Sequence, residues 1–313
     1  MNEITKLKQS FKKKEIDKST FVKQMHLLHR RLFEYAEILK DTDILKIEIV
    51  DGQVFMQSKT AGIKLICDDQ DERTAPIEIL NFDSYEKEEI IMMSSLIYQM
   101  GSRQSLIFFD VGTNIGWYSI FFAKNFPQLK VFSFEPIPKT FNYLIKNITL
   151  NDLNDKIKAY NFGFSDKNEE LIFYYYPEGS VNASAVNLSG LQNVEQLKCQ
   201  VKKMDDFSSI NNIYPDFIKC DVEGAEFFVF KGGLDTLQKS YPVVFSEMLR
   251  KWSAKFNYHP NEIIKLFCQI GYECFIVKEN KLIKILLVDE ETVETNFFFL
   301  HVEKHADLIK KFL

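Results

Sequence analysis

The sequence predicts an α/β fold with a doubly wound, mostly parallel sheet of seven strands and helices on both faces. Two observations support it. Short apolar runs alternate with segments of helical composition, which is typical of βαβ units. Five of these runs also end on an acid, as expected where the carboxyl ends of parallel strands share one edge of a sheet. The runs and their acids are Leu106–Phe109 with Asp110, Val131–Phe134 with Glu135, Ile157–Phe164 with Asp166, Phe217–Cys220 with Asp221, and Val243–Ser246 with Glu247.

The first of these strands leads into a glycine turn and then a helix. Asp110 stands at the end of the strand, and Gly112 and Gly116 lack a Cβ where a ligand has to approach the backbone. The G-x-x-x-G spacing differs from the G-x-G-x-x-G of dinucleotide-binding folds. A carboxylate directly before the turn would repel a pyrophosphate but suits a cation. S-adenosylmethionine, with an ammonium and a sulfonium, is the obvious candidate.

Composition narrows the class of protein. With 313 residues, 46% hydrophobic and 27% charged, the chain can bury a large core. A net charge of -5 argues against a nucleic-acid partner. No apolar stretch is long enough to span a membrane, and the first 18 residues lack the apolar core of a signal peptide. Five scattered cysteines without a C-x-x-C pair indicate a reduced, cytoplasmic protein without zinc.

Residues 1–84 are expected to form an extension before the main domain, residues 85–313. Asp51-Gly52 between two apolar runs predicts a β-hairpin, Ile47–Val50 with Val54–Met56, and Ile63–Cys67 reads as a further strand. An amphipathic helix should precede the hairpin and pack on its own domain or in a homo-oligomer. Its apolar positions are Phe21, Met25, Leu28, Leu32, Tyr35 and Leu39.

In the main domain, helices are expected at Glu86–Met100, at Phe141–Leu150, and from Pro260 to the residue before Gly271. The segment Gly179–Asn193, poor in charge, is either a substrate lid or a disordered insertion. The remaining expected elements are the strands Leu171–Tyr176, Cys274–Val277, Lys284–Val288 and Phe297–His301 and a final helix over Glu303–Leu313.

Four ordered motifs together resemble the FkbM family of class I methyltransferases, which have a Rossmann-like fold. They are D-V-G-T-N-I-G-W-Y-S from Asp110, F-E-P around Glu135, G-F-S-D ending at Asp166, and I-K-C-D-V-E-G-A-E ending at Glu226, followed by Gly232-Gly233. The resemblance runs from about Asn81 to Phe299. It implies S-adenosylmethionine as methyl donor, S-adenosylhomocysteine as product, and a hydroxyl as the usual acceptor.

The resemblance also assigns cofactor-binding residues. Glu135 would accept hydrogen bonds from both ribose hydroxyls, because its carboxylate has two oxygens. Phe164, Ser165 and Asp166 would border the adenine. The full set is Asp110, Gly112, Thr113, Asn114, Gly116, Glu135, Pro136, Phe164, Ser165, Asp166 and Asp221.

The block Lys219–Glu226 is the best candidate for the chemistry. A lysine within a central strand has to be neutralised, so Lys219 and Asp221 form either a structural ion pair or a catalytic floor beneath the transferred methyl group. Glu247 ends an apolar strand, and desolvation should give its carboxyl the pKa of a useful base. Glu223 and His259 are the other proton acceptors expected at this edge. We expect no divalent metal, because Lys219 already supplies positive charge near Asp221, Glu223 and Glu247.

The function expected from these features is O-methylation of a sugar hydroxyl in glycan biosynthesis. One alternative is O-methylation of a small secondary metabolite, such as a polyketide or peptide. A dinucleotide-binding oxidoreductase is disfavoured by the glycine spacing. A non-catalytic cofactor-binding protein is disfavoured by the intact Asp221, Glu223 and Glu247.

Overall fold

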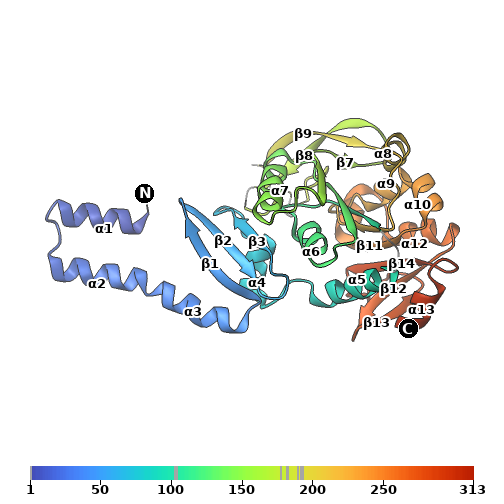
Figure 1. Cartoon of the computed structure of the whole chain (residues 1–313). Helices are drawn as coiled ribbons and strands as arrows, with labels where there is room; N and C mark the ends of the chain where they lie inside the picture. The colour runs from blue at the N-terminus through green and yellow to red at the C-terminus, as the bar shows by residue number, and fades with distance from the viewer. Residues whose placement is uncertain (1, 102–104, 177, 181–182, 189, 191–193) are drawn as a thin grey trace.

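The computed structural model describes residues 2–101, 105–176, 178–180, 183–188, 190 and 194–313. Figure 1 shows a helical arm at the N-terminus, a small antiparallel sheet next to it, and a large α/β body that contains the C-terminus. No helix in these ranges is long and apolar enough to cross a membrane.

The body is built on one eight-stranded sheet with the order β13-β12-β14-β11-β10-β4-β5-β6. Strands β11, β10, β4, β5 and β6 are parallel neighbours, whereas β14 runs antiparallel to both β11 and β12. The predicted mostly parallel α/β sheet is confirmed, with eight strands instead of seven. The bounds are β4 Leu106–Val111, β5 Leu129–Phe134, β6 Ile157–Tyr160, β10 Phe217–Cys220, β11 Val243–Glu247, β12 Tyr272–Lys278, β13 Lys281–Ile285 and β14 Asn296–His301.

Strand β13, the eighth of the sheet, forms a hairpin with β12. Glu279 and Asn280, both with positive φ, connect β12 to β13 in a tight turn. Residues 281–285 therefore pair with β12, and the strand ends three residues before the predicted end at Val288.

Helices cover both faces of the sheet and enclose two separate cores. Phe108 faces one core, which is covered by α5 (Lys87–Met100), α6 (Trp117–Asn125) and α7 (Pro138–Leu150). Phe109, its neighbour, faces the other core. This alternation is the period-two pattern of a strand buried on both faces. The second face is covered by α8 (Met204–Asn211), α9 (Glu226–Lys231), α10 (Leu234–Ser240) and α12 (Pro260–Gln269), and the remaining helices of the body are α11 (Arg250–Ser253), η2 (Ala254–Phe256) and α13 (Ala306–Phe312).

The predicted strand Ile157–Phe164 is divided between two sheets. Strand β6 ends at Tyr160, and β7 (Gly163–Phe164) belongs to a three-stranded sheet with β9 (Glu195–Lys202) and β8 (Glu169–Tyr175). The break follows from Asn161, whose side-chain amide donates to the carbonyls of Glu135 (2.8 Å) and Pro136 (3.1 Å). The prediction that Asp166 follows a strand of the central sheet is therefore wrong.

The small N-terminal sheet is attached to the body. Its strands are β1 (Ile44–Val50), β2 (Gln53–Ser58) and β3 (Lys64–Cys67), and Asp51-Gly52 forms the predicted hairpin turn with positive φ at both residues. The side chain of Asn147 on α7 accepts a hydrogen bond from the Ile66 amide at 2.9 Å. Helix α4 (Ala75–Phe82) then leads back towards the body.

The N-terminal arm consists of α1 (Glu3–Lys12), α2 (Lys18–His29) and α3 (Arg31–Asp41). The predicted amphipathic helix over Phe21–Leu39 is interrupted at Arg30, where α2 ends and α3 begins. None of the three helices contains a buried residue, and Figure 1 shows the arm extending away from the body. Of its predicted apolar positions, Leu39 is partly buried against the core of the same domain, whereas Leu32 and Tyr35 are exposed.

Candidate active site

The sheet carries a cavity of about 460 Å³ at the carboxyl ends of β4, β5, β10 and β11. The strand order reverses between β4 and β10, and open α/β sheets bind ligands at such a point. Ten of the residues predicted as site residues line the cavity: Gly112, Thr113, Asn114, Glu135, Pro136, Phe164, Lys219, Asp221, Glu223 and Glu247. Five others are not among its lining residues: Asp110, Gly116, Ser165, Asp166 and His259.

The glycine turn after β4 is shaped by its contact with the end of β10. A Cβ added at Gly112, whose φ is +75°, would lie 1.8 Å from the carbonyl oxygen of Asp221. Glycine is therefore required here by the close approach of two backbone segments. The sequence-based interpretation had attributed its role to an approaching ligand.

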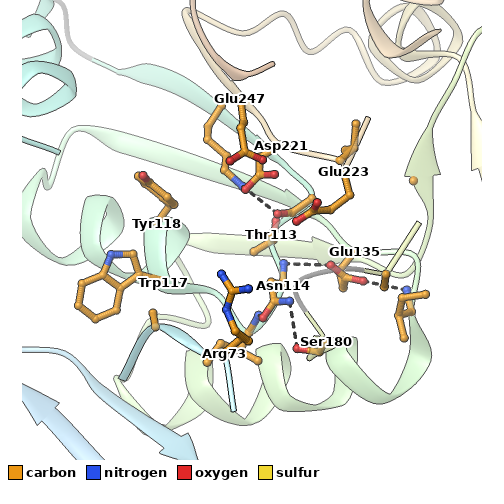
Figure 2. A pocket seen from close by; sticks show the side chains of 18 of the residues that line it. Arg73, Thr113, Asn114, Trp117, Tyr118, Glu135, Ser180, Asp221, Glu223 and Glu247 are labelled. Carbon is orange, nitrogen blue, oxygen red and sulfur yellow. Dashed lines mark hydrogen bonds and ion pairs between the residues drawn. The ribbon is translucent and has the colours of Figure 1, made fainter. Parts of the chain in front are cut away.

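Glu135 is held in a fixed position beneath this turn. It is 5% exposed, and its two carboxylate oxygens accept hydrogen bonds from the Asn114 and Ile137 amides, both at 2.9 Å (Figure 2). Burial raises the pKa of Glu135 to about 7, although these two backbone donors oppose the shift. Because each carboxylate oxygen can accept a further hydrogen bond, both can still bind ligand hydroxyls.

Asp110 lies behind the cavity wall and binds protein groups. It is fully buried, and its carboxylate accepts a hydrogen bond from the Ser119 hydroxyl at 2.6 Å. Lys219 Nζ lies 3.6 Å from Asp110 Oδ1 and 3.3 Å from Asp221 Oδ2, and it donates to the Gly112 carbonyl at 2.8 Å. Burial alone would lower the pKa of Lys219, but the nearby carboxylates together raise it. Lys219 is therefore a buried cation between Asp110 and the cavity.

Three carboxylates gather above Lys219. One oxygen each from Asp221, Glu223 and Glu247 lies within 4.8 Å of the other two, which is close enough to hold a metal ion. Burial, followed by repulsion from neighbouring carboxylates, raises the pKa of both Glu223 and Glu247 well above the ordinary value. The three groups thus form a site of high negative potential, which favours protons or a cationic ligand.

Glu226 fixes the loop that carries Glu223. It is 1% exposed and accepts hydrogen bonds from the Val222 amide (3.0 Å), the Gly224 amide (3.1 Å) and the Tyr258 hydroxyl (3.2 Å). Glu223 and Gly224 both adopt positive φ within this loop. The motif V-E-G-A-E therefore positions a left-handed turn at the cavity, anchored by its last residue.

The predicted residues outside the lining have other partners. His259 is exposed and caps α12, where its Nδ1 accepts from the Asn261 amide at 3.3 Å. Asp166 pairs with Lys231 at 3.1 Å. The Ser165 carbonyl would lie 2.1 Å from a Cβ at Gly232, which explains the first glycine of the pair that follows the last motif.

Several lining residues were not identified from the sequence. The Tyr118 hydroxyl donates to Glu86, and burial raises the pKa of Glu86 to about 7. Tyr85 and Glu86 mark only a domain boundary in the sequence and carry no motif. Trp117 and Tyr118 lie inside the first motif, directly after the glycine turn, so their position at a helix start was a usable signal. Arg73 comes from the extension and had no recognisable signal.

The fold and the cavity define a doubly wound α/β protein with a polar ligand site at its switch point. Residues 110–274, more than half of the chain, match the family described as the methyltransferase FkbM domain. The chain belongs to the FkbM methyltransferase family, so the resemblance seen in the sequence is confirmed. The matched domain is a methyltransferase domain, and the family implies S-adenosylmethionine as its methyl donor.

The chain is similar to two fungal methyltransferases. It is 29% identical over 153 residues to methyltransferase sdnD of Sordaria araneosa, covering 39% of this chain and 58% of that protein. It is 26% identical over 141 residues to methyltransferase 1 of Beauveria bassiana, covering 39% and 56%. A third match, 25% identical over 158 residues, covers 39% of the chain and 7% of the AMB antimetabolite synthetase AmbE of Pseudomonas aeruginosa. The matched regions thus span less than two thirds of each of these relatives.

Solved structures give weaker overall likenesses. A methyltransferase FkbM from Methylobacillus flagellatus KT has a TM-score of 0.39 and 16% identity, covering 63% of this chain and 44% of that one. A SAM-dependent methyltransferase from Agrobacterium tumefaciens has a TM-score of 0.42 and 9% identity, covering 81% and 71%. The family assignment rests on the matching domain.

Proposed function

We propose that the protein transfers a methyl group from S-adenosylmethionine to a hydroxyl oxygen of a sugar in glycan biosynthesis. The observation that supports this most is the position of two kinds of acid in one cavity. Glu135 is fixed by backbone amides and can bind a ribose, whereas Asp221, Glu223 and Glu247 form a separate acidic cluster (Figure 2). A cofactor with an adenosine and a positively charged sulfur matches both parts.

The protein groups would align the acceptor and take up its proton. S-adenosylmethionine supplies an activated methyl group on a sulfonium, so alignment of the acceptor oxygen is the main requirement. We assign Glu247 as the base that accepts the hydroxyl proton as the oxygen–carbon bond forms and the carbon–sulfur bond breaks. Asp221, whose carboxylate lies 3.3 Å from Lys219 Nζ, would hold the acceptor or the cofactor.

The remaining lining residues favour a sugar as acceptor. Tyr85, Trp117, Tyr118 and Trp252 present aromatic rings to the cavity, next to carboxylates. Aromatic faces pack against the C–H faces of a sugar ring, and carboxylates accept hydrogen bonds from its hydroxyls. A small secondary metabolite is the second candidate acceptor, which the similarity to a protein named as an antimetabolite synthetase favours.

Two measurements test the proposal. Calorimetry should show micromolar binding of S-adenosylhomocysteine and no binding of NAD, and Glu135→Ala should weaken the former about 10- to 100-fold through lost hydrogen bonds to a charged group. NAD binding, or unchanged affinity in Glu135→Ala, would contradict the cofactor assignment.

Incubation with methyl-labelled S-adenosylmethionine and separate extracts of glycans and small metabolites should then place the label in the glycans. Label only in metabolites would select the second acceptor class.

A further inference from the structure

Trp117 places a hydrogen-bond donor in the cavity wall without a protein partner. The residue lines the cavity and is 7% exposed, and its ring packs edge-on against Tyr85 with centroids 5.7 Å apart. In the part of the chain that the structure describes, the buried indole Nε1 has no hydrogen-bond partner. Buried donors are nearly always paired, so an acceptor atom that enters the cavity is the expected partner.

Arg73 brings a cation into the same cavity from outside the FkbM domain. Its Nε donates to Glu78 Oε1 at 2.9 Å, and its backbone amide donates to Asp71 Oδ1 at 3.0 Å, so both ends of the residue are held. Within the described ranges no hydrogen bond engages its two Nη groups. Figure 2 shows the guanidinium next to Asn114 and away from Asp221 and Glu247.

The other cations of the cavity are already engaged. Lys219 is neutralised by Asp110 and Asp221, and Lys251 Nζ lies 4.1 Å from the centroid of the Trp252 ring. Arg73 is therefore the lining guanidinium, and its Nη donors have no hydrogen-bond partner among the residues described. The planar fork of a guanidinium matches a carboxylate, with two parallel hydrogen bonds.

We propose that Arg73 and Trp117 form a carboxylate-binding subsite of this cavity. Two sources could supply the carboxylate: the amino-acid end of S-adenosylmethionine or an acidic group on the acceptor. Choosing these sources rests on the proposed methyltransferase function. The subsite itself rests on the unpaired indole N–H and on the free guanidinium donors. It makes the extension, which lies outside the matched domain, a part of the binding site.

The test compares two cofactor analogues, of which only one has the amino-acid end that carries the carboxylate. S-adenosylhomocysteine has the amino-acid end, and 5′-methylthioadenosine lacks it. By calorimetry, Arg73→Ala should weaken S-adenosylhomocysteine about 10- to 100-fold and leave 5′-methylthioadenosine unchanged. Arg73→Lys should give an intermediate loss. Trp117→Phe, which keeps an aromatic ring, smaller than the indole, but lacks the N–H, should give a smaller loss. Arg31→Ala on the distant arm serves as the matched control and should change neither affinity.

The second source is tested on the protein saturated with S-adenosylhomocysteine. If Arg73→Ala leaves both analogues unaffected, acetate titrated into this complex should quench tryptophan fluorescence in the wild type and not in Arg73→Ala. That result would assign the subsite to an acidic acceptor. Equal responses of wild type and Arg73→Ala to all three ligands would overturn the subsite. Failure of the wild type to bind either analogue would contradict the proposed function instead.

Discussion

Glu247 and Asp221 differ in the charges that surround them. Asp221 forms an ion pair with Lys219, whose Nζ lies 3.3 Å from its carboxylate. No ion pair joins Glu247 to another residue in the described part of the chain, and burial raises its pKa well above the ordinary value. Glu247, with its raised pKa, is therefore the better candidate for the base, whereas Asp221 is engaged by Lys219.

Glu247→Gln should lower kcat by roughly 10²–10⁴ while S-adenosylhomocysteine binding stays near that of the wild type. The reason is that the amide cannot accept the acceptor's proton. Because the raised pKa keeps Glu247 protonated at low pH, the wild-type rate should rise with pH as this proton is lost, and the variant should lack that rise. Glu290→Gln, at an exposed residue, is the control. A wild-type rate in Glu247→Gln between pH 6 and 9 would move the role of base to Glu223.

The three clustered carboxylates also lead to a prediction about metal dependence. The group of Asp221, Glu223 and Glu247 could hold a divalent ion, but Lys219 Nζ already lies next to Asp221. We expect turnover of S-adenosylmethionine to S-adenosylhomocysteine to survive EDTA without loss. Loss on chelation that magnesium restores would show that the cluster is a metal site, since magnesium is commonly bound by one or two carboxylates and water.

The sequence motifs predicted which acids lie close together, but not whether each carboxylate faces the cavity or the protein interior. Glu135, Asp221, Glu223 and Glu247 line one cavity because strand ends and motif spacing bring them there. Asp110 has the same position in its strand, yet it faces Lys219 and Ser119 inside the protein. An acid before a glycine turn has the same sequence pattern in both orientations. His259 shows the same limit, because its capping role depends on where α12 begins.

At the scale of elements, the loop between β10 and α9 determines the shape of the acidic cluster. Glu223 and Gly224 have positive φ, and two backbone amides of the loop donate to Glu226. A non-glycine residue with positive φ is uncommon and persists where its surroundings hold it. The loop is therefore held mainly by one buried carboxylate.

Glu226→Ala should destabilise the protein by about 1–3 kcal/mol, because it leaves buried backbone donors unpaired. Glu226→Gln should cost less at pH 7 because it keeps an acceptor. Burial raises the folded-state pKa of Glu226 to about 7, above the ordinary 4.5. The wild type should therefore lose stability as pH rises from about 4.5 through 7, and Glu226→Gln should show less of this loss. Urea unfolding at pH 5.5 and 8 measures both effects, and a pH-independent difference between the two proteins would contradict the assignment.

Apolar runs predicted the parallel strands, whereas breaks between neighbouring elements depended on side-chain contacts. The division of β6 from β7 follows from hydrogen bonds of Asn161 that no periodicity reveals. The interruption between α2 and α3 at Arg30 falls within one continuous apolar pattern. Turn chemistry was more informative, since Asp51-Gly52 fixed the first hairpin.

At the scale of the whole molecule, the cavity joins the extension to the body. The predicted boundary between residues 84 and 85 stays a prediction, but Arg73, Glu78 and Ser84 line the cavity together with Tyr85 and Glu86. The small sheet is also tied to α7 through Asn147 and Asn151, which bond to the backbone of β3. The residues after the arm are thus structurally part of the catalytic unit.

The arm has a different relation to the rest of the chain. Residues 2–40 include ten lysines and arginines against five acids, while the chain as a whole is acidic. Val22, Leu32 and Phe33 are exposed by 56%, 63% and 66%, respectively. Near its end, Leu39 packs on the core, and Lys59 Nζ donates to the Leu39 carbonyl at 2.7 Å. The arm is therefore anchored to the body at its last residues.

Deleting residues 2–38 should leave the catalytic unit intact. Because no residue of α1, α2 or α3 is buried, the midpoint of thermal unfolding and the affinity for S-adenosylhomocysteine should stay at their full-length values. The apolar spacing alone would instead predict that deleting the helix exposes its apolar face and causes aggregation or loss of an oligomer. Sedimentation of both proteins over a range of concentrations should show any self-association only in the full-length chain, since the exposed apolar side chains of the arm are the surface that a second copy would cover. Deleting residues 2–17 is the control, because it retains α2 and α3. A lower unfolding midpoint or aggregation of the longer deletion would show that the arm stabilises the body through contacts beyond Leu39.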